Sequence, residues 1–368
     1  MAILTQNPKT RTPAALLATL ATLTLMAPTA CSTDKPPTTP KISQAAPKSS
    51  AAPLPPEPAT PSAAPTSSTP APAISEAEGI STSQNYFDQS KKARSAHDIK
   101  ALENIESGAL LEISKGRQER ILKYGDSVAD DEDLAANNDF HVAPPQASPP
   151  GSDRWILSIG RQTIGKQSRE SLGVSRQLGG IGPWRMTFLA FSDVGKEFPS
   201  AAEIATIDGK NVLASTNIDY GVEICRDFAS YLDGGSTKNA WGPKAKSVVQ
   251  DDKNNKHDSE VLTKGGTASF KTEVRDIDKI PSWRTTDGGR LVMCTTRTTS
   301  SLTAGPASSI TITQSRSFQN FNGKITTWKT LNVVNVGMVV IKVPPVKGTP
   351  IEIVAASARP LSADGIPS

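Results

Sequence analysis

The chain has 368 residues, with 40 Lys+Arg against 36 Asp+Glu, and only 36% of its residues are hydrophobic. Its length is enough for about two domains, and its near-balanced charge argues against a nucleic-acid-binding protein, which usually carries a clustered basic face. With only 3 histidines, the chain has little scope for histidine-based catalysis or metal ligation. We therefore predict neither a cofactor nor a metal site.

Residues 1–30 are predicted to be an export signal. A short basic start precedes an apolar run of about 14 residues, from 14 to 27, which suits a signal peptide and is too short for a membrane span. Cys31 follows a small residue, as in a bacterial lipobox, although Pro28 stands where leucine is usual. We predict that Cys31 is lipidated, which would anchor the protein to the outer face of the cell membrane. The alternative is plain secretion, with Cys31 an incidental thiol.

Residues 31–75 are predicted to be a disordered tether. This segment consists almost entirely of Pro, Ala, Ser and Thr. Such a composition buries too little apolar surface to offset the entropy of folding. Pro-rich chains favour an extended form, so the tether would hold the folded part away from the membrane.

The first folded domain is predicted over residues 76–216. Residues 81–84 (STSQ) have the pattern of a capping box and predict a helix start at Ser81. Apolar residues continue at helical spacing as far as Tyr124, with an interruption at residues 107–108, which predicts two or three helices. Strand patterns follow, including a hairpin that turns at residues 208–209.

The second domain, residues 217–368, is predicted to repeat this plan. An amphipathic helix covers residues 220–232, and Pro243 opens another helix. Several strand patterns come next, of which the apolar run at residues 331–343 is the longest. Because crossover helices do not separate the strands, we expect antiparallel sheets. The predicted class is α+β, with two tandem domains whose N-terminal helices pack on a curved antiparallel sheet.

Five short segments carry a resemblance to a known family. They are residues 84–87 (QNYF), 94–98 (RSAHD), 151–157 (GSDRWIL), 183–189 (PWRMTFL) and 285–292 (TTDGGRLV). Together with the cysteine-anchored signal, they resemble an uncharacterised family of actinobacterial lipoproteins, known as a domain of unknown function, over residues 80–360. The resemblance implies tandem domains similar to the cystatin-like or nuclear-transport-factor-like superfamily, in which a curved sheet often leaves a cleft. It brings no catalytic residues.

A few side chains are candidates for a site. His97, Trp155, Trp184 and Trp283 are the candidate cleft-lining residues, although each also fits a structural role in the core. Cys225 and Cys294 are a candidate disulfide, since an exported protein with one lipidated cysteine has two left to pair. The alternative is two buried thiols that pack as small apolar residues.

The sequence shows no catalytic constellation, and we predict that the protein is not an enzyme. The predicted function is a lipid-anchored module that binds a small ligand, a peptide or a cell-wall component, with no nucleic-acid partner. Two alternatives stay open: a structural partner within an envelope complex, and a cleft-type α+β hydrolase. Neither the ligand nor the oligomeric state follows from the sequence.

Overall fold

The computed structural model describes these parts of the chain: 74–124, 137–143, 151–164, 167–192, 198–200, 203–204, 206–207, 210–211, 218–275, 280–311 and 327–368. All of them fall within one compact unit. Cys31, the predicted signal peptide and nearly all of the predicted tether lie outside the described residues, as does the predicted domain boundary between residues 216 and 217.

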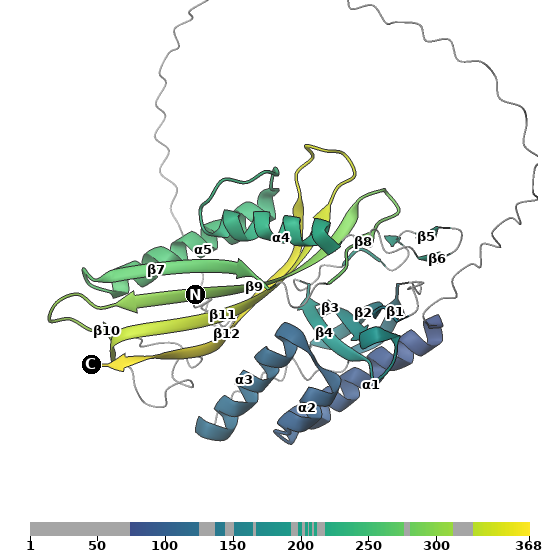
Figure 1. The fold of residues 1–368 in the computed structure, drawn as a ribbon, viewed down its shortest axis with the longest axis horizontal. Coiled ribbons are helices and arrows are strands. Elements are labelled where there is room, and N and C mark those ends of the chain that lie inside the picture. Colours follow the sequence, from purple (N-terminus) through teal and green to yellow (C-terminus); the bar gives the residue numbers. More distant parts are fainter. Residues whose placement is uncertain are drawn as a thin grey trace, which may run out of the picture. The chain divides into compact units, whose positions relative to one another are not determined.

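The first half of the described chain is three helices followed by an antiparallel sheet. The helices are α1 (Glu76–Ser95), α2 (Ile99–Ile105) and α3 (Gly108–Tyr124). The sheet has the strand order β1-β2-β3-β4, with β1 at Asn137–Val142, β2 at Arg154–Ile164, β3 at Gln167–Gln177 and β4 at Arg185–Phe191. The three helices lie together on one side of this sheet (Figure 1). Two short strands, β5 (Thr206–Ile207) and β6 (Lys210–Asn211), then pair as the predicted hairpin.

The start of α1 corrects the predicted capping box. The helix begins at Glu76, and the side chain of Ser75 caps it by accepting a hydrogen bond from the backbone N–H of Glu78 at 3.2 Å. Acidic side chains in this first turn add a favourable interaction with the helix dipole. Ser81 therefore lies inside the helix, and the prediction of a start there is wrong. The nearby Ser83 is buried, and its hydroxyl donates to a backbone carbonyl one turn earlier.

The second half repeats the order of helices and then strands. Helices α4 (Ile218–Leu232) and α5 (Pro243–Leu262) come first, and Pro243 is the first residue of its helix, as predicted. The strands are β7 (Thr267–Val274), β8 (Trp283–Arg284), β9 (Arg290–Thr303), β10 (Ile310–Thr311), β11 (Thr327–Val343) and β12 (Glu352–Pro367). They form one antiparallel sheet in which β11 pairs with β9, β10 and β12, and β9 also pairs with β7 and β8. The predicted α+β class, with antiparallel sheets, is confirmed.

The central strands of the second sheet are buried on both faces. In β11, Val336, Met338 and Val340 point into a core shared with the first half, whereas Val339 and Ile341 point into a separate core with α4 and α5. Figure 1 shows α4 and α5 along one face of this sheet. Double burial explains why residues 336–341 read as a continuous apolar run instead of alternating.

The shared core joins the two halves. From the first half it takes side chains of β2, β3 and β4, and from the second half those of β9, β11 and Trp283. Trp283 is 1% exposed and Leu291 is fully buried. Because each half contributes one wall of this core, neither half can expose its wall without losing hydrophobic burial.

A disulfide ties the helix layer of the second half to its sheet. Cys225 of α4 and Cys294 of β9 are bonded, with an S–S distance of 2.02 Å and a separation of 69 positions in the sequence. Both cysteines are buried in the core that α4 and α5 form with the sheet. In the chain-entropy account, closing a loop of this size stabilises the fold by about 4 kcal/mol.

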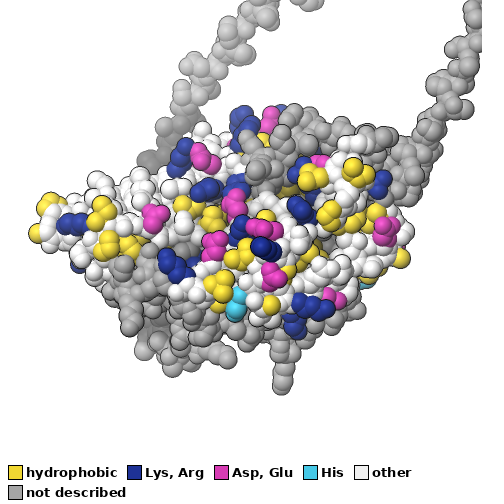
Figure 2. Space-filling model, turned by 60° about the horizontal axis from the view of Figure 1, so that its bottom comes forward, with side chains coloured by type: hydrophobic (Ala, Val, Ile, Leu, Met, Phe, Trp, Pro, Cys, Tyr) yellow, Lys and Arg dark blue, Asp and Glu magenta, His cyan; other side chains and the backbone are white. Residues whose placement is uncertain are grey.

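The surface mixes charges of both signs. On the face drawn in Figure 2, Lys and Arg side chains are interspersed with Asp and Glu instead of gathering in one basic patch. Among the described helices, none combines the length and the apolar character needed to cross a membrane.

Leu291→Ala should destabilise the protein because it opens a cavity in the shared core. We expect a loss of about 3 kcal/mol in the free energy of unfolding, measured by urea denaturation. Leu122→Ala is the matched control, since Leu122 is 61% exposed, and it should change stability by less than about 0.5 kcal/mol. Equal effects of the two substitutions would contradict a core that spans both halves.

Candidate functional site

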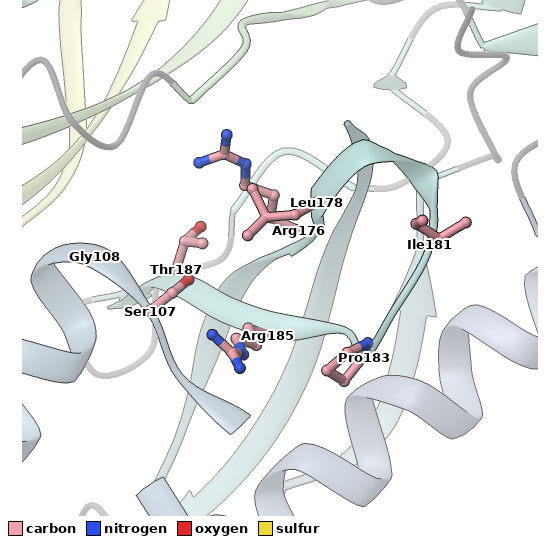
Figure 3. Close-up of a pocket in the computed structure, with 8 residues that line it drawn as sticks. All are labelled: Ser107, Gly108, Arg176, Leu178, Ile181, Pro183, Arg185 and Thr187. Carbon is pink, nitrogen blue, oxygen red and sulfur yellow. The ribbon is translucent and has the colours of Figure 1, made fainter. Parts of the chain in front are cut away.

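A pocket of about 220 Å³ lies where the first turn of α3 meets the hairpin of β3 and β4. Its lining combines cationic, hydroxyl and apolar side chains, and Figure 3 shows them as sticks. The lining residues are Ser107, Gly108, Arg176, Leu178, Ile181, Pro183, Arg185 and Thr187. We take this pocket as the candidate site.

The turn between β3 and β4 forms the rim of the pocket. Residues 178–183 (LGGIGP) include Gly179, Gly180 and Gly182, with φ of 60°, 71° and 90°. Glycine adopts this left-handed region without steric cost. The turn leaves Leu178 53% exposed and Ile181 79% exposed. Two large apolar side chains therefore stand at the rim beside the pocket.

Two arginines face each other across the hairpin. Arg176 of β3 and Arg185 of β4 are directly opposite in the antiparallel register, a placement that is unfavourable for like charges. Asp153 offsets the charge of Arg176, because Arg176 donates to its carboxylate through Nε at 2.8 Å. The Arg176 guanidinium also lies over the Trp155 ring, 5.2 Å from its centre.

Arg185 is the lining cation that has no partner among the described residues. Its side chain is partly buried, and its Nε–H is shielded from solvent without a hydrogen bond. Among the residues that the structure describes, none forms an ion pair with it. Leaving a buried donor unpaired is costly. The pocket therefore contains one positive charge that no carboxylate of the described residues neutralises, and a bound anion would remove this cost.

Asp153 contacts the glycine-rich turn as well as Arg176. Its second carboxylate oxygen accepts a hydrogen bond from the backbone N–H of Gly179 at 2.8 Å. Burial alone would raise the pKa of Asp153, but the Gly179 N–H and the Arg176 guanidinium together hold the pKa below its usual value. The carboxylate is therefore ionised at neutral pH and fixes both the turn and Arg176.

A buried ion pair positions the other wall of the pocket. Glu106, the residue before Ser107, is fully buried, and its Oε1 accepts hydrogen bonds from Tyr86 Oη at 2.9 Å and Arg94 Nη2 at 3.2 Å. Burial and then the Glu106 carboxylate raise the pKa of Tyr86 well above its usual value, so its hydroxyl keeps the proton that it donates. The next backbone N–H, of Ser107, donates to Met186 of β4 at 2.9 Å. These bonds hold the start of α3 against the sheet.

The groups around the pocket suit an anion. Arg185 supplies a guanidinium, and the start of a helix carries a partial positive charge. In Figure 3 the side chains of Ser107 and Thr187 are drawn between the two guanidinium groups. The Thr187 hydroxyl already donates to Val174 O at 3.1 Å, so Ser107 is the hydroxyl left to donate. The lining can therefore bind a small negatively charged group beside an apolar one.

Comparison with known proteins identifies the family. The family described as a domain of unknown function (DUF8094) matches residues 70–365. The chain belongs to this family. No curated protein and no solved structure matches the chain significantly. The predicted membership of an uncharacterised family is thus confirmed at this level, while the actinobacterial origin, the lipoprotein status and the cystatin-like fold stay predictions.

The candidate cleft residues of this DUF8094 chain do not line the pocket. His97 is exposed in the turn between α1 and α2, with φ of 54°, and its Nδ1 lies 2.7 Å from Gln118 Oε1. Trp155 and Trp283 are buried in the shared core. Trp184 is partly buried against a small cluster that includes Ile156. The pocket lining contains none of these four residues.

The pocket residues were not identified from the sequence. Arg176 and Arg185 flank the glycine-rich turn at equal distance from its middle, and that symmetry is the signal that could have found them. In the described residues, no group of three or more His, Cys, Asp or Glu is placed to hold a metal ion.

Glu106→Gln should destabilise this DUF8094 domain strongly, because it leaves the buried Arg94 charge without its carboxylate. We expect a loss of about 3–5 kcal/mol in the free energy of unfolding, measured by urea denaturation. Glu103→Gln is the matched control: it removes an ion pair with Lys115 whose side chains are 43% and 37% exposed, and it should have little effect. A mild effect of Glu106→Gln would show that the pair does not anchor α3.

Asp153→Asn should lower stability at neutral pH and not in acid. A carboxylate whose pKa is depressed in the folded state contributes stability above its unfolded pKa and loses it as the pH falls through the folded value. Urea denaturation at a series of pH values should therefore show the gap between wild type and variant closing below about pH 4. The exposed Asp258 of α5 provides the control substitution Asp258→Asn, which should give no such pH-dependent gap.

Proposed function

We propose that the protein is a lipid-anchored, non-catalytic binding module on the outer face of the cell membrane. The pocket at the start of α3 would take its ligand, which is a small molecule, a peptide or a cell-wall component. The observation that carries this proposal is the Arg185 guanidinium, unpaired among the described residues, in a pocket that the exposed side chains of Leu178 and Ile181 also line. Arginine keeps its proton at every ordinary pH, so it suits binding better than proton transfer.

The N-terminal sequence supports the location. Cys31 directly follows the apolar run of the predicted signal, and the Pro-, Ala-, Ser- and Thr-rich residues up to 75 would act as a spacer. Two or more acyl chains give stable membrane attachment where a single chain gives marginal binding. The resemblance described above adds an actinobacterial envelope as the setting and a cystatin-like or nuclear-transport-factor-like origin of the fold.

Mass spectrometry of the full chain, purified from bacterial membranes in detergent, tests both parts of the proposal. Under denaturing conditions, a mass increase that matches two or three acyl chains should remain on the protein. Under native conditions, a non-covalent adduct should be present and should leave on collisional activation. Its mass would begin to identify the ligand.

The variant Cys31→Ala is the control for the anchor. It should lose the covalent mass increase and leave the membrane fraction, while it keeps the non-covalent adduct. An unmodified wild-type mass would contradict the anchor. If native mass spectrometry shows the protein without any non-covalent adduct, even when it is purified from the source membranes, the binding module is contradicted. A structural role in an envelope complex would then be favoured.

A further inference from the structure

The net charge of the pocket limits its ligand. Asp153 neutralises Arg176, and Arg185 keeps one positive charge with no partner among the described residues. A carboxylate carries one negative charge and fits the planar fork of a guanidinium through two parallel hydrogen bonds. A phosphate monoester, with a charge of about −1.5 to −2 at pH 7, would leave part of its charge unpaired.

The size of the pocket limits the ligand further. Its volume of about 220 Å³ lies below the range of about 300–1,000 Å³ that is usual for ligand pockets. One carboxylate and one small side chain would fill it, and the rest of a longer ligand would have to leave the pocket.

The same pocket is lined by apolar side chains and by the Arg185 cation. Arg185 begins the strand that follows Pro183 and Ile181, so the apolar and charged groups of the lining are close neighbours in the chain. A ligand that carries a negative charge close to an apolar group matches this lining. The last residue of a peptide meets this condition, because its carboxylate and its side chain are attached to the same carbon. An Asp or Glu within a chain carries its charge at the tip of the side chain instead.

From the charge of the pocket, its volume and its apolar rim, we propose that it binds the terminal carboxylate of a peptide whose last residue has a small apolar side chain. Arg185 would bind the carboxylate, with the Ser107 hydroxyl as a second donor. Leu178, Ile181 and Pro183 would cover the side chain. The assignment rests on the proposed binding function and specifies the chemical class of its ligand.

Isothermal titration calorimetry on the full chain tests this assignment. The probe is acetyl-alanyl-alanine with a free carboxylate, and the comparison ligand is the same peptide with a C-terminal amide. The amide should bind at least about tenfold more weakly, because it lacks the charge that pairs with Arg185. Binding of the acid should also weaken at high salt. Since both ligands are tested on the wild-type protein, this comparison does not depend on the folding of a variant.

Variants then locate the site. Arg185→Gln should weaken binding of the acid to the level of the amide, and Ile181→Ser should weaken both ligands without affecting the fold, since Ile181 is 79% exposed. Arg359→Gln, which changes an exposed arginine of β12, should bind as the wild type does. Circular dichroism checks that each variant is folded.

Three outcomes would overturn the assignment: equal binding of acid and amide, tighter binding of inorganic phosphate than of the acid, or unchanged binding by a folded Arg185→Gln variant. If the peptide acid fails to bind while the native adduct described above is present, the protein remains a binding module and only its ligand class is wrong. If neither is observed, the proposed function fails as well.

Discussion

The double burial of β9 and β11 is the constraint on which the rest of the structure depends. One face of these strands packs against α4 and α5, and the other face packs against β2, β3 and β4 of the first half. A sheet that is covered on both faces needs apolar residues at consecutive positions. Residues 336–343 meet this need, with buried side chains at nearly every position. The first half is therefore one of the two layers that the second sheet requires, and the two sheets share a single core.

Helix α3 connects this core to the pocket. Its first residue lines the pocket, and further along Glu112 forms a two-bond ion pair with Arg275 of the second half, at 2.7 and 2.5 Å. Arg120 donates to the carbonyl of Pro360 in β12 at 3.0 Å. The buried Glu106 fixes the start of the helix from the other side. The wall of the pocket is thus held by both halves, although its other lining residues belong to the first half alone.

Much of the fold could be predicted from local patterns, because apolar spacing, Pro243 and the long run at residues 331–343 each determine local structure directly. The capping-box rule failed at Ser81 because the same pattern also fits Ser75 and Glu78, where the helix starts. The pocket was not predicted, because the facing of Arg176 and Arg185 follows from the conformation of the glycine-rich turn, and the placement of α3 beside them depends on tertiary contacts that spacing does not show. Spacing alone likewise could not decide whether Cys225 and Cys294 are bonded.

The position of the disulfide has a consequence for the order in which the chain can fold. Cys225 and Cys294 both precede β11 in the sequence, so their bond can form before β11 has joined the sheet. At that stage α4 would already be fixed over one face of β9, while the edge of β9 that pairs with β11 is still open. The later strand would then add to a template whose helix layer is covalently in place, which restricts the register that β11 can adopt.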